Sequence, residues 1–224
     1  MSQREIRTAR LRNVFKADEK RKPNLNAKLA RLCVLYEDLR VELCGIVELS
    51  IPALDVLDDD KYRRLYFVRR SIGTIREFAE ALRLVTDDPD FQLNEMKEDK
   101  ATWYLAIKFF KENESLLGDI RNDICGHFGH QAALKALGRL PDASCDIELV
   151  DGRDQIDLRL RFAGEIVTSA LRPHLQSDDI EGYKTLLRDC IKPAYRHATR
   201  CVQTLVGEYL LRSFVSQLSI EEKK

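Results

Sequence analysis

Apolar residues recur every three or four positions over several long stretches of this chain. This is the spacing of one face of an α-helix, because 3.6 residues make a helical turn. In the first stretch the repeating residues are Leu25, Leu29, Leu32, Leu35 (or Tyr36), Leu39 and Leu43. In the second they are Leu65, Val68, Ile72, Ile75, Phe78, Ala79 and Leu82. Helices with one apolar face bury it by packing together, so the sequence predicts an all-α, mainly helical bundle.

Capping residues and turn residues set the expected limits of these helices. Asn24 or Asn26 suits the N-cap of a helix that runs to about Glu48. Aspartates at 58–60 suit the N-terminus of a helix that runs to Val85. The Thr-Asp-Asp-Pro-Asp segment that follows predicts a turn, so we assign its aspartates to turn formation and capping, not to catalysis or metal binding.

A third helix, capped by Asn94, places an arginine in line with its apolar residues. Arg121 lies 18 residues, or five ideal turns, after Trp103. The apolar residues of the same face are Trp103, Ile107, Phe110 and Leu117. An arginine in such a row needs a partner or must face a cleft, because a buried unpaired charge is costly. Gly118 leaves open whether this helix is continuous.

In the second half of the chain, a segment with alternating apolar and polar residues interrupts the helical spacing. A short helix should end at Gly138. Residues 146–162 then alternate apolar and polar side chains around an Asp-Gly pair, which predicts a small β-hairpin that packs on the helices or extends a partner's sheet. A helix up to Pro173 and a last long helix to about residue 215 follow, the latter kinked or split by Pro193.

The length of 224 residues suits one domain. We expect a helical domain over 25–218, preceded by a basic arm or frayed helix at 1–24 and followed by a frayed tail at 219–224. The formal net charge is zero, so any nucleic acid must bind at a local patch and not through a global positive field.

No targeting or membrane segment is expected in this chain. The N-terminus has no apolar signal region, and there is no run of about 18 apolar residues. The six cysteines are scattered and form no Cys-x-x-Cys pair. We therefore expect a cytoplasmic protein with reduced thiols and no membrane partner.

The segment Arg-Asn-Asp-Ile-Cys-Gly-His-Phe-Gly-His, at 121–130, concentrates groups that suit phosphodiester chemistry. Metal-free RNA cleavage needs a base for the 2′-OH, an acid for the leaving 5′-oxygen and a cation for the crowded phosphorane. Histidine suits proton transfer near neutral pH, and arginine offers a permanent charge with a planar set of donors. The candidate catalytic residues are therefore His127 as acid or base, Arg121 as phosphate clamp and Asn122 as orienting group.

This segment resembles the motif of the HEPN superfamily: an arginine, a polar residue such as asparagine, and a histidine after four to six intervening residues. Here five residues intervene, from Asn122 to Gly126. The resemblance covers about residues 25–140. It implies a HEPN-like helical domain, a homodimer with two motifs facing one composite cleft, and a metal-independent endoribonuclease of toxin–antitoxin or defence systems. It also implies that Arg121, Asn122 and His127 line the cleft.

The glycines of the segment permit two interpretations. Six positions on an ideal helix turn His127 about 120° away from Arg121. Gly126 and Gly129 can allow a bend or a close approach of a partner backbone, which brings both side chains to one cleft. Alternatively, Gly126 is an ordinary C-cap and His127 is a core or capping residue.

Other residues are considered for RNA binding, metal binding or catalysis. Arg69, Arg70, Arg76 and His130 are candidate RNA-binding residues, although the arginines also suit an ordinary solvated helix face. Cys125, His127 and His130 lack the spacing of a zinc site, so we expect no metal and no cofactor. His174 and His197 suit structural positions better than catalysis.

The function predicted from sequence is an endoribonuclease that leaves a 2′,3′-cyclic phosphate, with RNA and an antitoxin protein as candidate partners. One alternative is a non-catalytic HEPN-like dimer that acts as an interaction or RNA-binding module. A third class is a helical regulator that binds a small molecule in a deep apolar pocket.

Overall fold

The computed structural model describes residues 7–8, 23–48, 59–91, 100–125, 130–140, 162–175, 180–205 and 221–222. Nearly all of these residues are helical, which confirms the all-α prediction. The elements are β1 (Arg7–Thr8), α2 (Pro23–Glu48), α3 (Asp59–Thr86), α4 (Lys100–Glu112), α5 (Glu114–Ile124), α6 (His130–Leu137), α7 (Phe162–Leu171), η3 (Arg172–His174), α8 (Ile180–Leu186), η4 (Leu187–Ile191), α9 (Lys192–Thr204) and β2 (Glu221–Glu222). The predicted end of α2 at Glu48 and the predicted limits of α3 are confirmed. Helix α2 begins at Pro23, before both asparagines that were predicted as its N-cap.

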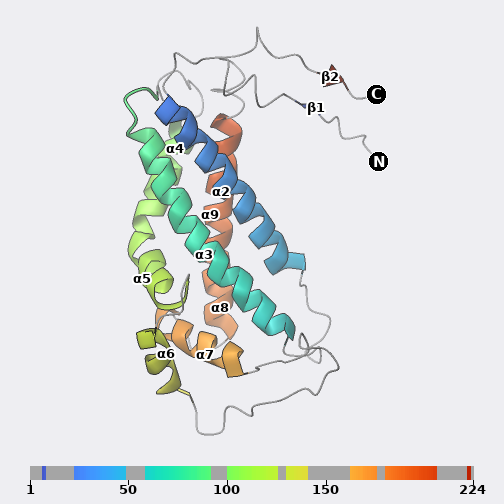
Figure 1. Ribbon diagram of the computed structural model, residues 1–224, viewed down its shortest axis with the longest axis vertical. Helices are drawn as coiled ribbons and strands as arrows, with labels where there is room; N and C mark the ends of the chain where they lie inside the picture. Colours follow the sequence, from blue (N-terminus) through green and yellow to red (C-terminus); the bar gives the residue numbers. More distant parts are fainter. Residues whose placement is uncertain are drawn as a thin grey trace.

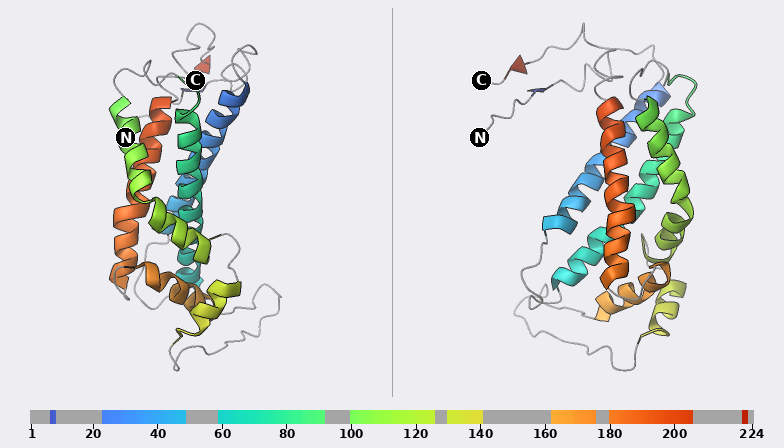
Figure 2. Two further views of the ribbon diagram at one scale, coloured as in Figure 1. Left: turned by 90° about the vertical axis from the view of Figure 1, so that its left-hand side faces the viewer. Right: turned by 180° about the vertical axis from the view of Figure 1, so that it is seen from behind.

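Helices α2, α3, α4 and α9 form an up-and-down bundle (Figures 1 and 2). Helix α2 packs along α3 and also contacts α9, which in turn packs against α4. The apolar residues predicted for α2 and α3 supply the centre of this bundle: Leu29, Leu32, Ile72, Ile75 and Phe78 are fully buried. Gly45 of α2 permits the close approach to α3, because a Cβ there would lie 2.7 Å from the ring of Phe67.

The turn after α3 confirms the structural role expected for its aspartates. Asp88 is buried and forms an ion pair with Lys28 of α2, with 2.7 Å between Nζ and Oδ2. Its Oδ1 also accepts a hydrogen bond from the backbone N–H of Asp90. Asp88 thus stabilises the turn and ties it to the bundle.

Helix α4 carries the largest buried side chain of the core. Trp103 is fully buried, and its Nε1 donates a hydrogen bond to Oγ1 of Thr86 at 2.8 Å. Its ring also packs against that of Phe91, with 5.2 Å between the centroids. This cluster joins the end of α3 to the start of α4.

Helices α5, α6 and α7 lie together toward the end of the bundle that is away from the Trp103 cluster (Figure 1). As predicted, α6 ends near Gly138, whose N–H donates to the carbonyl of Leu134. The last helix passes Pro193 through a π-helical turn, Leu187–Ile191, that leads directly into α9. Because proline has no N–H to donate, the wider turn lets the helix continue without that hydrogen bond.

Strand β1 pairs with β2 in an antiparallel register, Arg7 opposite Glu222 and Thr8 opposite Glu221. Almost all of the predicted β-hairpin at 146–162 lies outside the described residues, as do His127 and both glycines of the motif. No helix in the described ranges is long and apolar enough to span a bilayer.

Candidate functional site

The motif begins in the last turn of α5, where Arg121 and Asn122 are exposed. The buried residues of this helix are Leu117, Ile120 and Ile124. The prediction that Arg121 lies in the apolar row of Trp103 was therefore wrong. The helix is interrupted at Asn113, whose backbone (φ −98°, ψ 4°) separates α4 from α5, so the 18-residue spacing is not five uninterrupted turns.

Helix α5 ends before the first glycine of the motif. Cys125 adopts an extended backbone (φ −95°, ψ 149°), and its N–H donates to the carbonyl of Arg121 at 3.0 Å. The glycine at 126 is thus not needed to break this helix.

Two hydrogen bonds attach the end of α5 to α3. Arg69 donates from Nε to the carbonyl of Ile124 at 2.6 Å, and the Cys125 thiol donates to the carbonyl of Arg69 at 3.0 Å. Gly73 on α3 faces Cys125 closely, since a Cβ there would lie 3.8 Å from that of the cysteine. Arg69, predicted to bind RNA, therefore also positions the motif helix.

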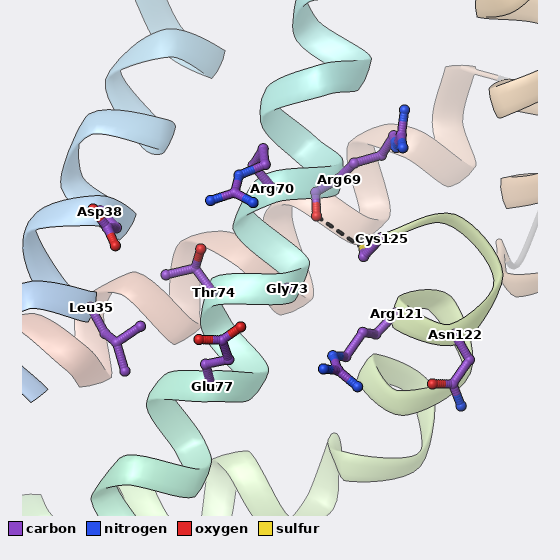
Figure 3. Close-up of a pocket in the computed structure, with 10 residues that line it drawn as sticks. All are labelled: Leu35, Asp38, Arg69, Arg70, Gly73, Thr74, Glu77, Arg121, Asn122 and Cys125. Carbon is purple, nitrogen blue, oxygen red and sulfur yellow. Dashed lines mark hydrogen bonds between the residues drawn. The ribbon is translucent and has the colours of Figure 1, made fainter. Parts of the chain in front are cut away.

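These contacts border a pocket of about 380 Å³ between α2, α3 and α5 (Figure 3). Its lining residues are Leu35, Asp38, Arg69, Arg70, Gly73, Thr74, Glu77, Arg121, Asn122 and Cys125. The structure thus brings together four residues that were selected from sequence for catalysis or RNA binding: Arg69, Arg70, Arg121 and Asn122. Asp38 and Glu77 were not selected from the sequence, because exposed polar positions on a helix carry no distinguishing pattern.

Two other predicted RNA-binding residues are not among those that line the pocket. Arg76 lies further along α3, where its Nη1 is 3.4 Å from the carbonyl of Glu114 and 3.2 Å from the position of a Cβ on Gly118. His130 is exposed at the first residue of α6.

The pocket contains more positive than negative groups. Its lining includes three arginines, Arg69, Arg70 and Arg121, and two carboxylates, Asp38 and Glu77. Arg69 is held by its contact with Ile124, whereas Arg121 extends from α5 toward Glu77 (Figure 3). Within the described ranges no ion pair involves Arg121. Arg121 is therefore available to an anion that enters the pocket.

A buried carboxyl group lies behind the α2–α3 wall. Glu42 is 6% exposed, and its Oε1 accepts a hydrogen bond from Thr74 Oγ1 at 2.9 Å. Arg70 Nε lies 3.7 Å from the same oxygen, whereas Oε2 has no hydrogen-bond partner in the described part of the chain. Burial raises the pKa of Glu42 to about 7 and outweighs the opposite effects of Thr74 and Arg70.

We expect Glu42→Gln to stabilise the protein at pH 8 by about 2 kcal/mol and to have little effect at pH 4. The folded wild type keeps the Glu42 proton up to about pH 7, whereas the unfolded chain releases it near the ordinary value of 4.5. Between these values the unfolded state binds fewer protons, so wild-type stability falls as the pH rises. The full shift is not expected, because pocket water and the exposed Arg70 screen the charge.

Urea unfolding at a series of pH values measures this difference. The matched control is Glu80→Gln, which removes an exposed carboxylate from α3 and should change stability by less than about 0.5 kcal/mol at every pH. A Glu42→Gln variant less stable than wild type at pH 8 would show that the ionised carboxylate stabilises the fold, contrary to this account.

His174 and His197 do not line the pocket. His174, on η3, is 2.8 Å from Asp123 of α5 through Nε2 and Oδ2, a contact that no local sequence pattern indicated. Because Asp123 follows Arg121 by two positions, or about 200° around the helix, this pair lies on the other flank of α5. His197 stacks on Phe109 at 4.8 Å, and burial lowers its pKa, in agreement with a structural position.

The cysteine of the motif is a buried thiol. Burial raises the pKa of Cys125 to about 11, so the thiol keeps the proton that it donates to Arg69. All the cysteines in the described residues are free. No group of three or more histidine, cysteine or acidic residues that could hold a metal ion occurs in the described ranges.

Comparisons of the chain with protein-family models, with curated proteins and with solved structures find no match.

Proposed function

We propose that this chain is a metal-independent endoribonuclease of HEPN type that binds the RNA backbone in the pocket between α2, α3 and α5. One observation carries the proposal: the motif residues Arg121 and Asn122 line the same pocket as Arg70, and Arg121 has no ion-pair partner in the described part of the chain. A guanidinium group in this situation binds a phosphodiester well, because it offers charge and two parallel N–H donors.

The chemistry then follows from the groups of the motif. A base removes the 2′-OH proton, the 2′-oxygen attacks phosphorus, and the 5′-oxygen leaves with a proton from an acid. His127 is proposed for proton transfer, since it follows the pocket residue Cys125 by two positions. Arg121 stabilises the additional negative charge of the phosphorane, and Asn122 orients the phosphate. In a homodimer, a second copy of the motif completes the cleft, and an antitoxin is a candidate regulator.

The alternative is a non-catalytic dimer that acts as an interaction or RNA-binding module. It is favoured by two exposed valines, Val34 (60% exposed) and Val41 (55% exposed), which lie seven residues apart and therefore on one face of α2. Exposed apolar side chains on one face are typical of a contact surface.

The test is RNA cleavage by the purified full chain in excess EDTA. We expect cleavage to survive chelation and to leave 2′,3′-cyclic phosphate and 5′-hydroxyl ends. His127→Ala should lower the rate about 100-fold or more, because a positioned acid or base contributes 10²–10⁴-fold. Absence of cleavage on diverse RNAs would favour the non-catalytic module. Cleavage unchanged in His127→Ala and Arg121→Ala would indicate another site or a contaminant.

A further inference from the structure

The two walls of the pocket offer different charged groups to a ligand. The α5 wall carries Arg121. The wall formed by α2 and α3 carries Asp38, Glu77 and the apolar Leu35. It also carries Arg69, which donates to the carbonyl of Ile124, and Arg70, whose Nε lies 3.7 Å from the Glu42 carboxyl group. In Figure 3 the guanidinium of Arg121 points toward the carboxylate of Glu77 across the pocket. No ion pair joins these two described side chains. A ligand that fits both walls needs an anion at one end and hydrogen-bond donors at the other.

Thr74 makes the α2–α3 wall still richer in acceptors. Its hydroxyl proton is donated to Glu42, at 2.9 Å, so its lone pairs are left for the pocket. An ionised carboxylate only accepts hydrogen bonds. Asp38, Glu77 and the Thr74 oxygen thus present acceptors beside Arg69 and Arg70, which contact Ile124 and Glu42. The part of a ligand that lies against these three acceptors therefore carries N–H or O–H groups.

We infer that the pocket binds a guanine nucleotide of the RNA, with Glu77 accepting the two N–H donors of the guanine Watson–Crick edge and Arg121 binding the phosphate. This inference rests on the proposed function and names the base that the site selects. The cavity of about 380 Å³ is in the range of small-molecule sites and can hold one nucleotide.

Guanine is the only standard base with two adjacent donors, N1–H and N2–H, on its Watson–Crick edge. Adenine and cytosine present one donor beside an acceptor there, and uracil presents one donor between two acceptors. An acceptor opposite the two oxygens of a carboxylate is repelled, so Glu77 selects guanine. Leu35 supplies apolar surface for the face of the base, and Arg121 binds the phosphate at the α5 end of the pocket.

The experiment is calorimetric titration of the full chain with the 3′-monophosphates of guanosine, inosine and adenosine, which needs no cleavage. We expect guanosine monophosphate to bind about tenfold more tightly than adenosine monophosphate, the discrimination typical of a bidentate contact. Inosine monophosphate, which lacks the N2 amine, should bind with intermediate affinity. Glu77→Gln should abolish the preference, because the amide opposes a donor with a donor.

Two control variants separate base recognition from charge. Asp38→Asn removes an equal charge from the same pocket and should keep the preference for guanosine. Arg121→Ala should weaken all three nucleotides alike. Equal affinities that still depend on Arg121 would overturn guanine recognition and leave the phosphate site intact. Absence of binding, or binding independent of Arg121, would overturn both. A guanosine preference retained in Glu77→Gln would also contradict the inference.

Discussion

Replacing Trp103 with alanine is expected to lower the free energy of unfolding by about 3–5 kcal/mol. The side chain is fully buried and contacts the ring of Phe91. The alanine variant leaves a large cavity at the junction of α3 and α4. It also removes the indole N–H that donates a hydrogen bond to Oγ1 of Thr86. Both the lost burial and the cavity lower stability, because the surrounding helices relax only partly.

Equilibrium unfolding in urea, followed by far-ultraviolet circular dichroism, measures this effect, since the variant loses the only tryptophan of the chain. Tyr104→Ala is the matched control, because this neighbouring aromatic residue is 51% exposed and its loss should cost less than about 1 kcal/mol. Trp103→Phe should have an intermediate effect. Equal stabilities of the Trp103→Ala and Tyr104→Ala variants would contradict the packing described here.

The helices of the bundle could be predicted because their apolar spacing is a local property. Leu29 and Leu32 of α2, and Ile72 and Ile75 of α3, are buried as their positions indicated. The exposure of Arg121 could not be predicted from the apolar spacing. Beyond the interruption at Asn113, Leu117 of the predicted row is buried together with Ile120 and Ile124, whereas Arg121 is exposed at the pocket. No strong breaker marks position 113.

The candidate site could be predicted only in part, for a similar reason. Arginines at 70 and 121 were selected by their chemistry, and the fold brings both to one pocket. Glu42, Asp38 and Glu77 were not selected, because their importance depends on how α2 packs against α3. Such long-range packing is not encoded in the spacing of residues along either helix.

If the chain cleaves RNA as proposed, we expect Arg121→Ala to lower the rate about 1,000-fold, because the proposed mechanism assigns to this guanidinium the stabilisation of the phosphorane charge. The variant should fold normally, since the side chain is exposed and has no ion-pair partner among the described residues. Arg121→Lys keeps the charge but loses the two parallel donors, so it should recover only part of the activity.

Single-turnover RNA cleavage in EDTA, compared between wild type, Arg121→Ala and Arg83→Ala, tests the central claim most directly. Arg83 is an exposed arginine of α3 that does not line the pocket, so Arg83→Ala controls for the loss of one positive charge. The account predicts cleavage by wild type and by Arg83→Ala, and loss of cleavage in Arg121→Ala. Equal rates for the two arginine variants would contradict a role for the pocket in RNA cleavage.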